Sequence, residues 1–373
     1  MVRLAAEHWD ANGKGNVVVH VMVTGGAGFI GSAVVRHLVL ERNYTVLNID
    51  NLTYAATLGS LEAVKGRPGY HFLKSDIADG EAMSRAFCDF HPDWVIHLAA
   101  ESHVDRSIAG ARTFVETNVV GTFNLLECAR RYWQKLKAPA KEAFRFLHVS
   151  TDEVYGALGK DGSFSETSRY DPSSPYAATK AASDHLARAW TRTYGMPVIV
   201  TNCSNNYGPH QFPEKLIPLT ILNALEGRSL PVYGDGSQVR DWLHVEDHVQ
   251  ALDLIAERGR AGETYNIGGR NERSNIEVVH RICAIMDEQR PHAQPHHQLI
   301  SHVPDRPGHD RRYAIDASKL EGELGWKAAE SFDAGVEKTV RWYLENDWWW
   351  RPLRERYDGR RLGHAELSAP ALA

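Results

Sequence analysis

The chain has 373 residues, of which 43% are hydrophobic and 24% are charged, and its formal net charge is -5. This composition predicts a folded globular protein of about two domains and excludes a wholly disordered chain. The absence of a basic excess argues against a nucleic-acid partner, and because there is no apolar run of about 18 residues, we expect no membrane span.

Short apolar runs alternate with helical patterns through the first part of the chain, after an N-terminal extension at residues 1–17. Six runs rich in β-branched or aromatic residues predict strands, at 17–24, 44–50, 70–76, 93–100, 144–151 and 196–204. Such alternation indicates βαβ units, and hence an α/β fold with a doubly wound parallel sheet. In this fold, ligands bind beyond the carboxyl ends of the strands.

From about Asn206 the pattern loosens, which predicts a smaller C-terminal substrate domain. We expect helices at 214–227, 246–258 and 274–290, and loops at 206–215, 304–312 and 351–360. The helix at 246–258 is expected to pack back on the sheet. The predicted division is a dinucleotide-binding domain at 18–205 with 241–268, a substrate domain at 206–240 with 269–345, and a tail at 346–373. The run Trp348-Trp349-Trp350 is expected to bury this tail.

A glycine turn follows the first predicted strand and opens a helix. Its glycines, Gly25, Gly28 and Gly31, are three residues apart, one residue more between the first two than in the strict dinucleotide fingerprint. They permit a tight turn, close approach of a pyrophosphate and close helix–strand packing. Asp50 ends the next strand, where a carboxylate bonds the adenosine ribose and favours NAD over NADP. Asp76 also ends a strand and either contacts the adenine or caps a turn.

A second group of residues carries acid–base chemistry. Tyr176 and Lys180 are four residues apart and share a helix face, where an ammonium can lower the pKa of the phenol and make it a general base. Thr151 ends a predicted strand and supplies a hydroxyl partner. Asp152 and Glu153 follow it directly. Paired carboxylates at this place are unnecessary for simple oxidation but serve elimination, which needs one group to remove a proton and another to donate one.

These motifs together resemble the extended short-chain dehydrogenase/reductase family, a Rossmann-type family that includes sugar-nucleotide epimerases, decarboxylases and dehydratases. The shared motifs are TGGAGFIG at 24–31, Ser150-Thr151 and YAATK at 176–180. Further blocks, including LAAESHVDRSI at 98–108 and PDRPGHDRRYAID at 304–316, are similar to the dTDP-glucose 4,6-dehydratases. The resemblance covers about residues 18–340. It implies an NAD-dependent hydro-lyase acting on a nucleotide sugar, with Asp152 as acid and Glu153 as base.

The resemblance also implies the residues of each site. Its catalytic residues are Thr151, Asp152, Glu153, Tyr176 and Lys180. Its NAD-binding residues are Gly25, Gly28, Phe29, Ile30, Gly31, Asp50, Asn51, Leu52, Thr53, Asp76, Ile77, Leu98, Ala99, Ala100, Ser102, Thr117, Tyr176, Lys180 and Asn206. Its substrate-binding residues are Ser102, Thr151, Asn205, Lys215, Leu216, Pro231, Tyr233, Arg240, Asn275, Arg306 and His309. Among these, Arg240 and Arg306 are the main candidates for the substrate's pyrophosphate.

The resemblance further implies a homodimer, paired through helices near 113–133 and 178–194. No C-x-x-C pair occurs among Cys88, Cys128, Cys203 and Cys283, so we expect a reduced, cytoplasmic protein. The histidines show no convincing metal-ligand spacing, and we expect no metal.

Two rival functions remain on the same fold. One is a UDP-sugar 4,6-dehydratase or another sugar-nucleotide epimerase or decarboxylase, and the Asp152-Glu153 pair argues against the last two. The other is a non-catalytic NAD-binding scaffold, which the presence of Tyr176 and Lys180 disfavours. The base of the nucleotide follows from the resemblance alone.

Overall fold

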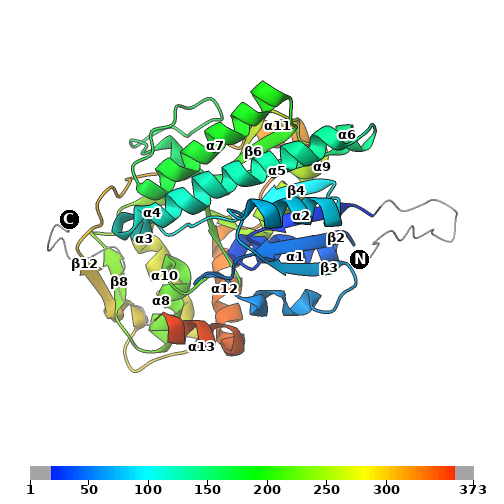
Figure 1. Ribbon diagram of the computed structural model, residues 1–373. Helices are drawn as coiled ribbons and strands as arrows, with labels where there is room; N and C mark the ends of the chain where they lie inside the picture. The colour runs from blue at the N-terminus through cyan, green and yellow to red at the C-terminus, as the bar shows by residue number, and fades with distance from the viewer. Residues whose placement is uncertain (1–17, 358–373) are drawn as a thin grey trace, which may run out of the picture.

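The computed structural model describes residues 18–357, and a seven-stranded parallel sheet forms its centre (Figure 1). The strand order is β10-β6-β5-β4-β1-β2-β3. The bounds are β1(His20–Thr24), β2(Thr45–Asp50), β3(Tyr70–Lys74), β4(Trp94–His97), β5(Arg145–Thr151), β6(Val198–Cys203) and β10(Thr264–Ile267). The six predicted strands are confirmed. The chain order reverses beside β1, so the sheet has a switch point at which ligands bind.

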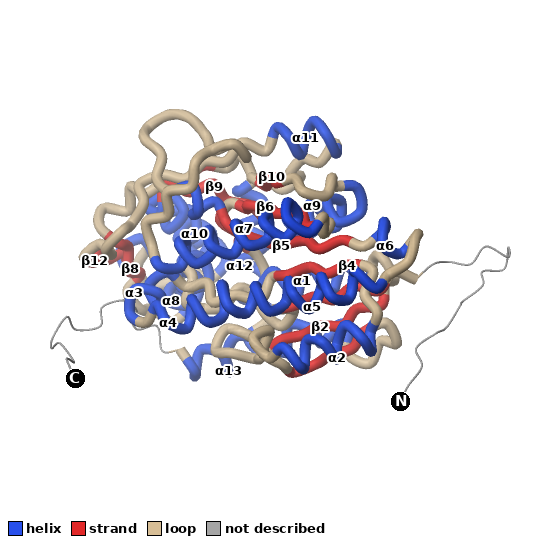
Figure 2. The backbone as a smooth tube through the Cα atoms, turned by 45° about the horizontal axis from the view of Figure 1, so that its top comes forward, coloured by secondary structure: helices blue, strands red, loops and turns tan. Residues whose placement is uncertain are grey.

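Helices cover both faces of this sheet because successive strand residues point to opposite sides. Val21 and Val23 face one hydrophobic core, and Met22 faces the other. The first core includes α1(Phe29–Leu40) and α9(Val245–Arg258), so the helix predicted at 246–258 does pack back on the sheet. The second includes α2(Gly80–Phe90), α5(Thr122–Lys135) and α7(Pro175–Tyr194), which lie side by side in Figure 2.

The seventh strand, β10, is a finding of the structure. Its four residues pair in parallel with β6, from Thr264 opposite Val200 to Ile267 opposite Cys203. The segment is too short to show a period of its own, and its edge position depends on β6.

We propose that the segments packed around a separate hydrophobic core, beside the carboxyl ends of the strands, form a second domain (Figure 1). The predicted helices at 214–227 and 274–290 are confirmed as α8(Leu216–Leu225) and α10(Asn275–Gln289). The domain adds a strand pair, β8(Leu230–Tyr233) with β12(Ile300–Val303), and helix α12(Phe332–Glu345). A small sheet, β11(Glu272–Ser274), β9(Val239–His244) and β7(Asn205–Tyr207), joins it to the first domain.

The remaining elements are short and connect these layers. They are η1(Leu58–Val64), α3(Val104–Ala109), α4(Ala111–Phe114), the π-helical segment η2(Val115–Gly121), α6(Ala140–Ala143), the 3-10 turns η3(Asp152–Tyr155) and η4(His296–Leu299), and α11(Ser318–Leu324). Across the described residues, every helix is too short or too polar to span a bilayer.

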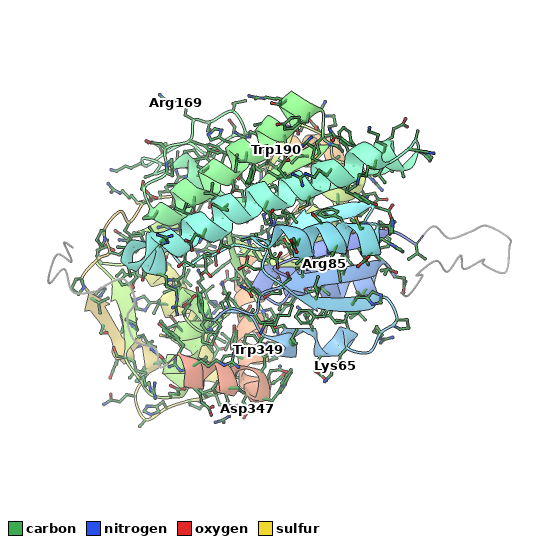
Figure 3. The ribbon with its side chains drawn as sticks, in the orientation of Figure 1. Lys65, Arg85, Arg169, Trp190, Asp347 and Trp349 are labelled. Atoms are coloured by element: carbon green, nitrogen blue, oxygen red, sulfur yellow. The ribbon has the colours of Figure 1, made fainter. Side chains whose placement is uncertain are left out.

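The loop predicted at 351–360 is wrong over its first half. Residues up to Arg356 belong to helix α13(Asp347–Arg356), while 358–360 lie outside the described residues. Trp349 and Trp350 are buried, and the Trp349 indole donates a hydrogen bond to Ser60 Oγ at 3.0 Å (Figure 3). Trp348 remains exposed. Burial of these two tryptophans therefore stabilises the helix, although Pro352 and the charged residues around it are typical of a loop.

Candidate active site

The glycine turn between β1 and α1 leaves no room for side chains. Gly25 has a φ of +74°, and a Cβ on it would lie 2.7 Å from the backbone nitrogen of Ala99. A Cβ on Gly28 would lie 3.3 Å from the carbonyl oxygen of Gly25, and one on Gly31 would overlap that oxygen. Residues 28–31, at the start of α1, line the adjoining cavity, and the N–H groups in the first turn of a helix have no partner within the helix. This is the arrangement that binds a pyrophosphate.

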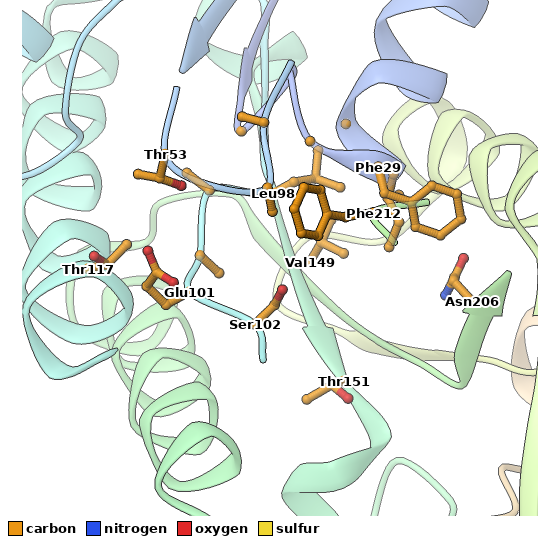
Figure 4. Close-up of a pocket in the computed structure, with 18 of the residues that line it drawn as sticks. Phe29, Thr53, Leu98, Glu101, Ser102, Thr117, Val149, Thr151, Asn206 and Phe212 are labelled. Atoms are coloured by element: carbon orange, nitrogen blue, oxygen red, sulfur yellow. The ribbon is translucent and has the colours of Figure 1, made fainter. Parts of the chain in front are cut away.

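That cavity, of about 320 Å³, runs along the carboxyl ends of the strands (Figure 4). Asp50 lies in its wall, where one carboxylate oxygen accepts a hydrogen bond from Ala27 N–H at 2.9 Å and the other from Leu52 N–H at 2.7 Å. Asp76 caps the turn by accepting Ala78 N–H at 2.8 Å, and it lines the same cavity, so its contact with the adenine stays a prediction. The cradle without side chains and the strand-end carboxylate fit NAD.

The structure brings nearly all the expected cofactor residues into this wall. Those that line it are Gly25, Gly28, Phe29, Ile30, Gly31, Asp50, Asn51, Thr53, Asp76, Ile77, Leu98, Ala99, Ala100, Ser102, Thr117, Tyr176, Lys180 and Asn206. Of the expected cofactor residues, all of which the structure describes, only Leu52 lies outside the wall, and it contributes through its hydrogen bond to Asp50.

A second cavity, of about 290 Å³, adjoins the first on the side of the smaller domain. Glu153, Asn205 and Lys215 line both cavities, so the two meet beside the catalytic candidates. The expected substrate residues lining the second cavity are Ser102, Asn205, Lys215, Leu216, Pro231, Tyr233, Arg240, Asn275, Arg306 and His309. Thr151 lines the first cavity, and Figure 4 shows it bordering the same pocket as Ser102.

The catalytic candidates come from the end of β5 and the start of α7. Thr151 ends β5, and its hydroxyl caps the following 3-10 turn by accepting Glu153 N–H at 3.3 Å. Ser174 caps α7, with Pro175 at the first helical position. Tyr176 therefore lies in the first helical turn, and its backbone N–H donates to Ser107 Oγ at 3.2 Å. The capped turn and the capped helix together place Thr151 and Tyr176 at one edge of the sheet.

Asp152 and Glu153 lie in different electrostatic surroundings. Asp152 is 1% exposed, and its Oδ2 has no hydrogen-bond partner. Burial, followed by the charge of Glu153, raises the pKa of Asp152 well above the usual value. Burial also raises the pKa of Glu153, but the cations of Arg306, Arg240 and Lys215 oppose that shift. Of the two carboxyl groups, Asp152 therefore holds its proton more strongly, and Glu153 is the one that ionises more readily.

The surroundings of Tyr176 contradict one expectation. Burial, followed by the charge of Glu153, raises the pKa of this phenol well above 10, and only the hydrogen bond with Thr151 is a counteracting cause. Lys180 was expected to lower that pKa, but its ammonium donates to the Val149 carbonyl at 2.9 Å. The protein alone therefore holds Tyr176 as a neutral phenol, because desolvation and the charge of Glu153 outweigh the hydrogen bond with Thr151.

Three cations converge on the second cavity. Arg240 is buried, stacks on the Tyr313 ring with 4.2 Å to the centroid, and donates to the Asp310 carbonyl at 2.9 Å. Arg306 is held by Asp105 at 3.0 Å. Lys215 Nζ donates to the Ser102 carbonyl at 3.1 Å. This arrangement suits a diphosphate, which needs several donors with positive charge.

Some residues that line the two cavities were not predicted from the sequence. Glu214 lines both cavities and joins two domains, since it accepts Tyr54 OH at 2.9 Å and Arg106 Nε at 3.1 Å. Its position directly before Lys215 is the only local signal that could have marked it. Tyr357 lines the second cavity from the end of the C-terminal helix, far along the sequence. Among the described residues, no group of three His, Cys, Asp or Glu side chains is placed to hold a metal.

Comparison with known proteins agrees with this architecture. The family model described as GDP-mannose 4,6 dehydratase matches residues 22–339. A probable dTDP-glucose 4,6-dehydratase of Sinorhizobium fredii is 64% identical over 349 residues, covering 93% of this chain and 99% of that protein. A dTDP-glucose 4,6-dehydratase of Neisseria meningitidis is 59% identical, covering 92% of this chain and 98% of that protein.

A solved structure extends the likeness to the fold. The dTDP-glucose 4,6-dehydratase of Streptomyces venezuelae with NAD and TYD bound is 47% identical, has a TM-score of 0.82, and aligns over 90% of this chain and 100% of that one. The predicted fold class and the resemblance to dTDP-glucose 4,6-dehydratases are therefore confirmed. With a family model spanning most of its length and relatives of such identity, the chain belongs to the GDP-mannose 4,6 dehydratase family.

Proposed function

We propose that the chain is an NAD-dependent hydro-lyase that converts dTDP-glucose into dTDP-4-keto-6-deoxyglucose. Its relatives carry the name of this activity at 64% and 59% identity, and a neighbour at 47% identity holds NAD and TYD. The observation that carries the proposal is the buried Asp152 beside Glu153, at the meeting point of the two cavities. Epimerisation has no use for an additional proton donor at that place.

The first step is an oxidation at carbon 4 of the sugar. NAD, when bound, accepts the hydride of carbon 4, returns it at carbon 6, and places a positive charge beside the phenol. Tyr176 acts as the base for the carbon 4 hydroxyl in its phenolate form, which the positive charge of bound NAD would favour, and Thr151 supports the phenol oxygen by a hydrogen bond. Lys180 lies one helical turn further along and provides a fixed cation near the phenol.

Elimination follows because the new ketone acidifies the hydrogen on carbon 5. Glu153, which faces three cations, is the group suited to remove this proton. Asp152 keeps its own proton and donates it to the carbon 6 hydroxyl, which leaves as water. The carbon 5 position is then reprotonated as carbon 6 gains its hydrogen. The cofactor ends as it began, so the glycine turn holds it through the whole cycle.

Arg240 is proposed to bind the diphosphate, and its loss is expected to weaken binding more than turnover. Arg240→Ala removes charge-assisted hydrogen bonds, each worth about 1.5–3 kcal/mol, so we expect KM to rise about 10- to 100-fold with a much smaller fall in kcat. Arg312→Ala is a matched control, because Arg312 pairs with Glu272 at 2.7 Å and lines neither cavity. An unchanged KM in steady-state kinetics of Arg240→Ala would contradict the proposed role.

The proposed activity is tested with the purified chain and dTDP-, UDP-, CDP- and GDP-linked glucose. We expect the alkali-induced absorbance of a 4-keto-6-deoxy product with dTDP-glucose. Preferential product from UDP-glucose would favour the UDP-sugar dehydratase instead. A 4-epimer without loss of water, detected by mass spectrometry, would overturn the proposal in favour of an epimerase.

We propose a homodimer formed by the helical segment at 111–135 and α7. Val115, Val120 and Phe123 on the first, and Tyr194 on the second, are exposed large apolar residues. The two helical segments lie side by side at the surface (Figures 1 and 2), and exposed apolar patches mark interfaces. Light scattering is expected to give about twice 41.8 kDa, and Phe123→Asp to reduce it. A monomer for the unaltered chain would contradict the dimer.

We propose that the protein works in the cytoplasm. All four cysteines are free, and three of them are buried. Free thiols are typical of a reducing compartment. Fractionation of the source cells is expected to place the activity with cytosolic enzymes, and recovery outside the cell would contradict this.

A further inference from the structure

Helix α7 carries a third chemical group in line with Tyr176 and Lys180. Asp184 is four residues beyond Lys180, so the three side chains share one helix face. Asp184 is 0% exposed and lines neither cavity. It cannot touch substrate or cofactor, and a carboxylate buried this deeply needs compensating partners.

The partners of Asp184 all donate to it. One oxygen accepts His148 Nε2 at 3.1 Å, and the other accepts Tyr170 OH at 2.8 Å and Asn202 Nδ2 at 3.2 Å. Burial opposes the charged form, but the hydrogen bond from His148 and the neighbouring charges hold the pKa of Asp184 below its ordinary value. Asp184 is therefore an ionised carboxylate inside the protein.

Lys180 needs such a charge. Its side chain is buried, and its ammonium donates to the Val149 carbonyl, a neutral acceptor. Burial lowers the pKa of Lys180, and the first cause that opposes this shift is the charge of Asp184. Without an opposite charge, a buried ammonium tends to lose its proton.

We propose that Asp184 is a positioning residue that acts through Lys180, as the buried counter-charge that keeps the ammonium of Lys180 protonated beside Tyr176. The inference rests on the proposed function, because it assigns Lys180 a charged role in the oxidation at carbon 4. Asp184 has a second link to the site, since Asn202 also donates to the Thr151 carbonyl at 3.1 Å. One carboxylate thus supports both the cation and the strand end that carries Thr151.

Other titratable groups surround the Lys180–Asp184 pair, and the test must separate them from it. They are His148 from β5, His97 from β4, Cys203 from β6, Tyr155 from η3, Tyr170 from the loop before α7, and Arg188 from α7 itself. Burial lowers the pKa of both His97 and His148, and raises the pKa of Cys203 to about 12 and that of Tyr155 well above 10. On the alkaline side, we therefore expect Asp184→Asn to change the pH at which Lys180 loses its proton.

The experiment mixes the NAD-loaded protein rapidly with dTDP-glucose across a range of pH. The near-ultraviolet absorbance of the reduced nicotinamide reports the oxidation at carbon 4 alone. Asp184→Asn lowers the pKa of Lys180, so the active charged form is lost at lower pH. We expect the alkaline limb of this rate to move down by about 1 pH unit or more, with KM for dTDP-glucose within about twofold. A merely structural role would lower the amount of active protein without moving this limb.

Asp253→Asn is the matched control, because Asp253 is also buried and accepts a histidine, His37 Nε2 at 2.9 Å, on the opposite face of the sheet. It is expected to leave the limb in place. If Asp184→Asn does not fold, Asp184→Glu and Asp184→Gln answer the same question, since they share a shape and differ in charge, and only the glutamine should move the limb. An unmoved limb in the neutral variants overturns the inference, whereas an unaltered chain that forms no product overturns the proposed function.

Discussion

Replacement of Tyr176 by phenylalanine is expected to lower the rate of oxidation at carbon 4 about 1,000-fold, the middle of the range for loss of a general base. The phenol oxygen is the proposed acceptor of the carbon 4 proton, and Thr151 is hydrogen-bonded to it. The ring itself is kept, including its edge contact with Phe114 at 6.4 Å between centroids. Binding of substrate should therefore change little. Rapid mixing with dTDP-glucose measures the step directly.

Tyr265→Phe is the control for this variant. Tyr265 is a fully buried tyrosine whose hydroxyl is bonded to Glu323 at 3.0 Å, and it lines neither cavity. The Tyr265→Phe variant also loses a buried hydroxyl, but it should oxidise dTDP-glucose at the native rate. Native oxidation by Tyr176→Phe would show that another group removes the carbon 4 proton.

Asp152→Asn is expected to slow elimination about 100- to 1,000-fold while oxidation at carbon 4 continues. An amide of the same shape fills the buried position but has no proton to give to the leaving hydroxyl. The absorbance of the reduced nicotinamide should therefore rise at nearly the native rate and then persist. Loss of water at the native rate, followed by mass spectrometry, would show that Asp152 is not the acid.

The same carboxyl predicts a pH dependence. Burial, followed by the charge of Glu153, holds the pKa of Asp152 well above its usual value, so the acid form persists to a higher pH than in an ordinary carboxyl group and is lost as the pH rises through that raised pKa. Elimination by the unaltered chain should decline over this interval. Asp152→Asn has no proton to lose there, so its residual elimination should be flat. A matching decline in the variant would assign the titration to another group.

Much of this site could be predicted from local signals. The turn at Gly25, Gly28 and Gly31 is marked by spacing alone, and the structure gives the reason, because a Cβ at Gly25 or Gly31 would collide with neighbouring backbone. The strand-end position of Asp50 and the four-residue spacing of Tyr176 and Lys180 are equally local. The structure places all of them in the wall of one cavity.

Other features had no local signal. Helix α13 resembles a loop in sequence, and it forms because Trp349 and Trp350 are buried. The Trp349 indole is bonded to Ser60, which is 289 residues away, and the Trp350 indole to the Tyr343 carbonyl on the preceding helix. Glu214 joins Tyr54 and Arg106, which lie more than 100 residues away from it. Such pairings depend on the completed fold.

The sequence by itself determined the six strands and the phosphate turn and marked the candidates for the acid–base groups, since periodicity and spacing act over a few residues. Only the tertiary structure decided the protonation of those groups. The pKa of Tyr176 shows this, because a lysine one helical turn away predicts a lowered value, and burial together with Glu153 gives a raised one. Desolvation depends on every segment that closes over a side chain, and those segments come together only in the folded protein.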